Sequence, residues 1–384
     1  MTASAPAPAP PPSPLASDSG QRLHHLDAMR SVLMLLGVVL HAANPYRGDG
    51  GWLVHDPAGS TALGALVVAI HAFRMPAFFV VAGYFAMRLL RGGPTGVFLR
   101  DRARRLLLPA MAILLSFNLA QVWFLAPAHP AGGFVEGALL PALRRGDWLG
   151  HLWFLVYLAV YCVALAALRP CLRALAARGF QGPSTSLALL LGVAALEPLA
   201  SAFAAHLLPT LNHAFGGIVD PIELLDNAPY FAVGCALAAD PALLRRFGSA
   251  GPGLWLAALG AGVVLALLPH PHGAAAMAVA VVARTVLHWG LVRIVFAAFR
   301  RWADRPRPAL RYLADASYSV YLFHHLFVVL AATALLPAHL PATAKFAVVL
   351  SVATVVPLAL HHLLVRRSTL AGWLFNGRPR RAPG

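Results

Sequence analysis

The chain has 384 residues, of which 59% are hydrophobic and only 11% are charged, and its mean hydropathy is +0.70. A soluble globular domain carries about a quarter charged residues, so this composition excludes an ordinary water-soluble protein. The formal net charge of +16 would favour nucleic acid as the partner of a soluble chain, but here the arginines are dispersed between apolar segments, and we expect no nucleic-acid partner.

The predicted elements follow one another as membrane spans. Residues 1–21 are rich in Pro, Ala and Ser and predict a disordered cytoplasmic tail. Residues 22–368 form a predicted transmembrane domain, because apolar segments recur there at about the 20 residues that cross the hydrocarbon core. Residues 369–384 predict a basic cytoplasmic tail. The expected fold is an all-α, polytopic integral membrane helix bundle of about ten transmembrane helices, at residues 27–46, 61–88, 106–126, 151–169, 186–207, 226–239, 253–269, 274–299, 315–336 and 343–365.

The charges predict the orientation of these spans. If the N-terminus lies in the cytoplasm, 22 of the 30 Lys and Arg residues fall on the cytoplasmic side, four on the opposite side and four inside spans. Cytoplasmic loops of membrane proteins carry an excess of Lys and Arg, so both termini are expected in the cytoplasm. The three cysteines show no metal-ligand or redox spacing and are interpreted as packing residues. No metal site is expected.

The first span, "LDAMRSVLMLLGVVLH", carries a charged and polar stripe. Arg30 and His41 are eleven positions apart, which returns them to nearly one helix face about 16 Å apart along the axis. Asp27 lies one turn before Arg30 on the same stripe. A polar group in a span usually faces a cavity or a partner, so this spacing fits a functional seam. An Asp–Arg pair at the helix end and a hydrogen-bonded histidine are the simpler alternative.

Two further blocks combine cations with helix signals. In "HAFRMPAFFVVAGYF", His71 and Arg74 are one turn apart before Pro76, which indicates either a bound ligand or a proline bend with a buried His–Arg pair. In "FLRDRARRLLLP", Arg102 and Arg105 share one face of a helix start. Such a pair suits bidentate binding of phosphate or carboxylate, whereas the neighbouring arginines are interpreted as topology signals.

Histidines recur in two later spans. "HLWFLVYL" begins with His151 at the predicted outer interface, where anchoring is favoured over catalysis. "SYSVYLFHHLFVV" places His324 and His325 at a depth comparable to that of His41, and a tandem pair is expected to turn only one member inward. Three other intramembrane polar residues are either buried ion pairs or proton-relay groups: Glu197, Arg284 and His288.

These blocks together resemble the membrane-bound acyltransferase 3 family. The resemblance is carried by "LDAMRSVLMLLGVVLH", "HAFRMPAFFVVAGYF", "RARRLLLP", "HLWFL", "SYSVYLFHH" and "WLFNGRP", which occur in the family's order over about residues 22–378. The resemblance implies that Arg30 and His41 are the essential arginine and the catalytic histidine, that Arg102 and Arg105 form the family's arginine pair, and that His324 is its late histidine. The blocks around His71, Arg74 and His325 resemble a group within the family that acts on periplasmic glucans.

The resemblance also implies an activity. The chain is expected to be an O-acyltransferase of a bacterial inner membrane that moves an acyl group, in particular succinyl, from cytoplasmic acyl-CoA to the hydroxyls of a periplasmic glucan or another extracytoplasmic glycan. Acyl-CoA would be a co-substrate, and no bound cofactor is expected. Two rivals stay open: an acetyltransferase acting on another polysaccharide or small molecule, and a proton-coupled transporter, since intramembrane His and Arg also relay protons.

Overall fold

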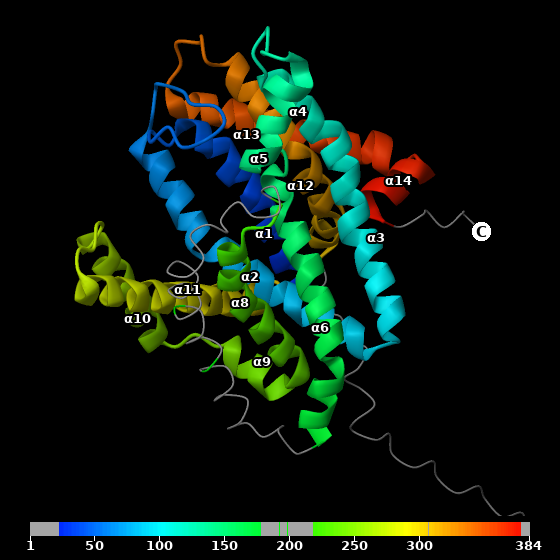
Figure 1. Cartoon of the computed structure of the whole chain (residues 1–384). Coiled ribbons are helices and arrows are strands. Elements are labelled where there is room, and N and C mark those ends of the chain that lie inside the picture. The colour runs from blue at the N-terminus through cyan, green and yellow to red at the C-terminus, as the bar shows by residue number, and fades with distance from the viewer. Residues whose placement is uncertain (1–22, 178–191, 193–197, 199–217, 306, 378–384) are drawn as a thin grey trace, which may run out of the picture.

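A computed structural model describes residues 23–177, 192, 198, 218–305 and 307–377, and every regular element in these residues is helical. The predicted tail at 1–21, Glu197 and nearly all of the predicted span at 186–207 lie outside the described residues. The helices, which Figure 1 labels where there is room, are α1 (His24–Ala43), η1 (Asn44–Tyr46), α2 (Thr61–Arg91), α3 (Thr95–Ile113), η2 (Leu114–Asn118), α4 (Leu119–Leu125), η3 (Val135–Leu139), α5 (Leu140–Arg145), η4 (Gly150–Leu152), α6 (Trp153–Ala177), α8 (Pro221–Ala239), α9 (Pro241–Phe247), α10 (Pro252–Leu267), α11 (Ala274–Trp302), α12 (Pro308–Ala334), α13 (Ala342–Leu360), η6 (His361–Val365) and α14 (Thr369–Asn376).

The predicted all-α class is confirmed, and nine of the ten predicted spans coincide with helices. Seven helical segments of the described chain are long and apolar enough to cross a membrane, or eight if α9 and α10, which meet at a 60° bend, form one broken span. These segments make the protein a multi-pass membrane protein. The expected count of about ten spans and the cytoplasmic position of both termini stay predictions.

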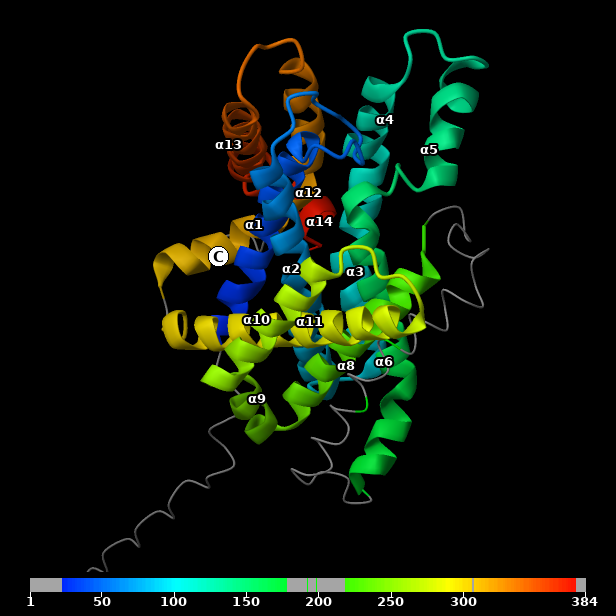
Figure 2. The ribbon, with the colours of Figure 1, turned by 90° about the vertical axis from the view of Figure 1, so that its left-hand side faces the viewer.

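The arrangement of the helices places α1 inside the bundle. α1 packs against α2, α11, α12 and α13, and α12 also packs against α13. Figures 1 and 2 show α11 lying across the other long helices in both views, with α10 beside it. The buried side chains of α1 are apolar along most of its length, so the few polar groups it carries must find partners within the bundle.

The contact between α2 and α8 depends on two glycines. A Cβ atom on Gly83 of α2 would come within 2.0 Å of the Phe231 carbonyl oxygen, and one on Gly234 of α8 within 2.0 Å of the Val80 carbonyl oxygen. Small residues let helix backbones approach closely where lipid provides no hydrophobic drive for association. These two glycines therefore hold α2, which carries Arg74, against α8.

The segment after residue 368 is not only a tail. Ser368 accepts a hydrogen bond from the Ala371 amide and begins α14, which packs against α3 and α12. Gly377 then takes a φ of +62°, and a Cβ there would lie 2.3 Å from the Arg104 carbonyl oxygen. The folded unit thus extends beyond the predicted boundary, because "WLFN" is apolar enough to pack. Residues 378–384 lie outside the described part.

Candidate active site

Four histidines from three separate segments meet near one end of the bundle. They are His41 at the end of α1, His151 in η4, and His324 and His325 in α12, and we refer to them as the histidine cluster. The His41 ring lies 5.3 Å from that of His324 and 5.1 Å from that of His325, centroid to centroid. The His151 ring stacks on His325 at 4.8 Å and meets His324 at 5.0 Å. Helices that are distant in sequence therefore converge on one chemical centre.

Three members of the histidine cluster are buried, and His41 is half-buried. The exposed fractions of His151, His324 and His325 are 5%, 0% and 3%, whereas His41 keeps part of its surface open. The expectation that only one of the tandem histidines faces inward is wrong. Both reach the centre, because the His41 ring and the His151 ring each lie within 5.3 Å of both His324 and His325, centroid to centroid.

Hydrogen bonds fix which nitrogen of His324 carries the proton. Its Nδ1 lies 2.6 Å from the Tyr321 carbonyl oxygen, which can only accept, so Nδ1 must be the protonated nitrogen. Its Nε2 is buried without a hydrogen-bond partner in the protein and holds a lone pair. His325 uses Nδ1 on the Gln121 side-chain oxygen at 2.7 Å. His324 thus presents a basic nitrogen inside the cluster.

Sequence reasoning placed His151 at the interface and missed its part in this cluster. The ring is buried, and neither of its nitrogens has a hydrogen-bond partner in the protein. Its segment is held from one side by Asn118, whose amide donates to the Trp148 and Leu149 carbonyl oxygens at 2.7 and 3.2 Å. Gly150 then adopts a φ of +50° and turns the chain into η4. The glycine before "HLWFL" was the signal that could have revealed this turn.

Arg74 brings a buried positive charge to the same region. Its side chain is 8% exposed, and its Nε has no hydrogen-bond partner in the protein. Nη1 of Arg74 lies 3.0 Å from the position that a Cβ on Gly37 would take. Gly37 is one turn before His41 on α1, so the guanidinium lies against α1 next to the cluster. A buried guanidinium with unused donors is chemically suited to an anionic group.

The loop between η1 and α2 covers the cluster with an aromatic ring. Trp52 lies 5.6 Å from the His325 ring and 6.4 Å from the His41 ring. The loop is anchored by a buried ion pair in which Lys345 Nζ of α13 lies 2.7 Å from Asp56 Oδ2, with side-chain exposures of 3% and 0%. Nearer its exposed tip, the hydrogen bond from Arg47 lowers the pKa of the Asp49 carboxyl. Trp52 therefore lies against two of the four histidine rings.

The remaining predicted site residues lie outside the cluster. Nη2 of Arg30 lies 3.9 Å from Oδ1 of Asp27, so the two form the Asp–Arg ion pair that the sequence offered as an alternative. The guanidinium carbon of Arg30 is 5.7 Å from the Phe85 ring centroid. Arg102 and Arg105 are half-buried on α3, and the Arg105 carbonyl accepts a hydrogen bond from the Tyr318 hydroxyl at 2.8 Å. His71 is exposed on α2.

The chemistry open to the cluster is proton transfer and anion binding. It holds imidazole nitrogens without partners and one buried guanidinium. Within the residues that the structure describes, no three His, Cys, Asp or Glu side chains are placed to hold a metal ion. Neutral imidazole is suited to accept a proton near neutral pH, and a guanidinium is suited to hold a carboxylate or a developing oxyanion.

Comparison with known proteins shows a matching family and several similar proteins. The sequence model of the family described as "Acyltransferase domain" matches residues 23–362. The chain is 27% identical over 326 residues to glucans biosynthesis protein C of Salmonella typhi and to that of Salmonella typhimurium, and 26% identical to that of Salmonella schwarzengrund. Each match covers 81% of this chain and 83% of the relative. No solved structure matches the chain.

Proposed function

Because the chain belongs to this acyltransferase family, we propose that it transfers an acyl group, specifically succinyl, from cytoplasmic acyl-CoA to hydroxyls of a periplasmic glucan or another extracytoplasmic glycan. The glycan acceptor is supported by the relatives named for glucan biosynthesis. The location that fits this pair of substrates is the inner membrane of a bacterial cell, since the donor and the acceptor meet there from opposite sides. The observation that carries the proposal is the half-buried His41 inside a cluster of buried histidines.

His41 acts as the general base in this proposal. As the sugar oxygen attacks the thioester carbonyl, its hydroxyl proton passes to the imidazole of His41. The carbon–sulfur bond then breaks, the protonated His41 returns the proton to the leaving thiolate, and an ester and free CoA result. The open part of His41 admits the hydroxyl, while its buried Nδ1 faces the protein. A covalent acyl-histidine intermediate would use the same groups in two steps.

Arg74 and the tandem histidines assist the reaction. The buried guanidinium of Arg74 suits either the succinyl carboxylate or the oxyanion of the tetrahedral intermediate. His324 presents a lone pair on Nε2, so it accepts a hydrogen bond from the acceptor sugar or takes up a proton. His325 orients the neighbouring rings through its bond to Gln121. His71, exposed one turn before Arg74, is assigned to contact with the substrate on the outer flank of α2.

Arginines at the beginning of the helices bind the donor. Arg102 and Arg105, half-buried on α3, would hold donor phosphates through paired N–H groups. Arg30 lies near the beginning of α1, eleven residues before His41, with 37% of its side chain exposed, and would steady the donor. The donor thus approaches along the helices from the arginine-bearing end, and the acceptor approaches past Trp52.

The test is transfer of a labelled acyl group by the purified protein. His41→Ala and His41→Gln are expected to lower kcat by about 10²–10⁴-fold, the range of general acid–base catalysis, while the protein still inserts and folds. His339→Gln, which changes an exposed histidine in the turn between α12 and α13, is the matched control and should be unaffected. Retained activity in either His41 variant would remove this residue from the mechanism.

Product analysis separates the alternatives. Mass spectrometry of periplasmic glucans, with and without the chain, should show succinyl esters that depend on it. Acetyl esters, or esters on another polysaccharide or small molecule, would identify the related acetyltransferase. A proton-coupled transporter would consume no thioester under any of these conditions.

A further inference from the structure

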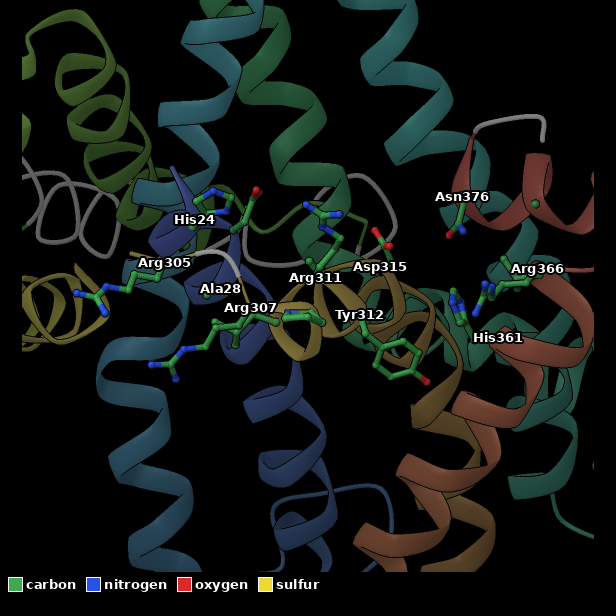
Figure 3. A pocket seen from close by; sticks show the side chains of 16 residues that line it. His24, Ala28, Arg305, Arg307, Arg311, Tyr312, Asp315, His361, Arg366 and Asn376 are labelled. Carbon is green, nitrogen blue, oxygen red and sulfur yellow. The ribbon is translucent and has the colours of Figure 1, made fainter. Parts of the chain in front are cut away.

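A cavity of about 800 Å³ opens where the beginnings of α1 and α12 meet η6 and α14. Figure 3 shows side chains from these elements spread along it. Four arginines line the cavity, three from the turn before α12 and its first residues and one from the turn after η6: Arg305, Arg307, Arg311 and Arg366. Two histidines, Tyr312, Asn376 and two carboxylates, those of Asp27 and Asp315, complete its polar lining, so the arginines outnumber the acids by two to one.

Three of the arginines that line this cavity form no ion pair with a described carboxylate. Among the described residues, no carboxylate forms an ion pair with Arg305, Arg307 or Arg311. Asp27 lies toward Arg30, and Asp304 pairs with His25. Nη1 of Arg366 lies 3.4 Å from Nδ1 of the His362 ring. Guanidinium groups grouped around a concave space bind phosphate well, because each offers planar paired donors and keeps its charge.

The size and charge together identify a ligand class. Small-molecule sites usually have volumes of about 300–1,000 Å³, so the cavity is large enough for a nucleotide. We infer that this cavity binds the phosphate-bearing nucleotide end of the acyl-CoA donor, an inference that rests on the proposed acyl transfer. Coenzyme A carries a diphosphate and a 3′-phosphate at that end, and its thioester lies at the far end of a long pantetheine chain.

The same helices connect the cavity with the histidine cluster. Asp315 of the cavity and His324 of the cluster are nine residues apart on α12, which is about 14 Å along a helix axis. α1 likewise begins at the cavity and ends at His41. A donor anchored by its nucleotide can therefore extend its pantetheine chain along α1 and α12 toward His41.

The cavity also adjoins one member of the α3 arginine pair. Asn376 lines it, and the next residue, Gly377, packs directly on the backbone of Arg104 and Arg105. Arg105 therefore lies beyond one wall of the cavity, whereas Arg102 lines a separate hollow between the end of α2 and the beginning of α3. The nucleotide end of the donor is placed in the cavity, on the side of Arg105.

A comparison of donors tests the assignment in nanodiscs of neutral lipid. Wild type and Arg311→Ala/Arg366→Ala are compared with succinyl-CoA and with succinyl-pantetheine, which has the thioester but no nucleotide. The double variant should raise the KM for succinyl-CoA by about 10- to 100-fold and leave the succinyl-pantetheine rate and the acceptor KM unchanged. Arg144→Ala, an exposed arginine of α5, is the control and should change nothing. An equal loss with both donors, or no loss, would overturn the inference.

A binding measurement makes the result independent of turnover. Adenosine 3′,5′-bisphosphate should stabilise the wild type against thermal unfolding and should not stabilise the double variant. If both proteins are stabilised equally, or if only anionic lipid distinguishes them, the cavity holds a lipid headgroup or nothing specific, and the inference fails. Absence of thioester consumption by the wild type, despite nucleotide binding, would instead refute the proposed acyl transfer.

Discussion

At the scale of single residues, the two ring nitrogens of His151 are unusual because they are buried without a hydrogen-bond partner in the protein. A buried polar atom usually has a hydrogen-bond partner, yet both nitrogens of this ring lack one in the protein, and the ring stacks on His325 in the centre of the cluster. A residue that served only to fill space would be less costly as phenylalanine. We therefore expect His151 to exchange protons or hydrogen bonds with the substrates.

His151→Phe tests this at constant shape. Phenylalanine keeps a flat ring against His325 but removes both nitrogens, so kcat should fall by about 10²-fold, at the low end of general acid–base effects. The donor KM and the thermal stability should stay near those of the wild type. His129→Phe, at an exposed loop position, is the matched control. If the activity of His151→Phe stays within twofold of that of the wild type, His151 serves only to pack against its neighbours.

The spacing in the sequence predicted one member of the cluster, His41. It could do so because Arg30 and His41 lie on one helix, whose period shows that they share a face. His151 was not predicted as a member, because its position depends on the hydrogen bonds of Asn118 and the turn at Gly150, which join segments distant in sequence. The tandem histidines were misjudged for a similar reason. The pattern of one helix does not show which rings from other segments, here His41 and His151, lie against it.

At the scale of elements, one buried ion pair fixes the loop that covers the cluster. Asp56 belongs to the loop that carries Trp52, and Lys345 to the first turn of α13. The pattern of charges along the sequence does not indicate that these two residues pair. Removing one partner of a buried pair leaves the other charge uncompensated, which costs about 3–5 kcal/mol. Removing both charges avoids most of that cost.

Asp56→Asn and Lys345→Met should each lower the free energy of unfolding by about 3–5 kcal/mol, and the double variant should recover much of the loss. Thermal unfolding in detergent, arranged as a double-mutant cycle, measures the coupling. Asp147→Asn, which breaks the exposed pair with Arg145, should cost no more than about 1 kcal/mol. Additive single effects would show that the ion pair does not hold the loop.

At the scale of the whole molecule, the number of membrane crossings decides whether the two termini lie on the same side. Seven segments qualify by length and composition, and the bent pair of α9 and α10 would make an eighth. α8 coincides with a predicted span but is not among the seven, and the predicted span at 186–207 lies outside the described residues. Helix lengths alone therefore leave the parity of the count open. The distribution of arginines predicts an even count, because it predicts that the two termini lie on one side.

Labelling of a native cysteine tests the predicted orientation of the chain in the membrane. Of the three cysteines, Cys162 and Cys235 are buried, and Cys171, between Arg169 and Arg173 near the end of α6, is exposed. The positive-inside pattern places this end of α6 in the cytoplasm. In intact spheroplasts, a membrane-impermeant maleimide should therefore leave Cys171 unlabelled until the membrane is permeabilised. Asp49→Cys in a Cys171→Ser background, on the loop that carries Trp52, should react without permeabilisation. The opposite labelling of the two positions would reverse the orientation and place the arginine-lined cavity away from cytoplasmic acyl-CoA.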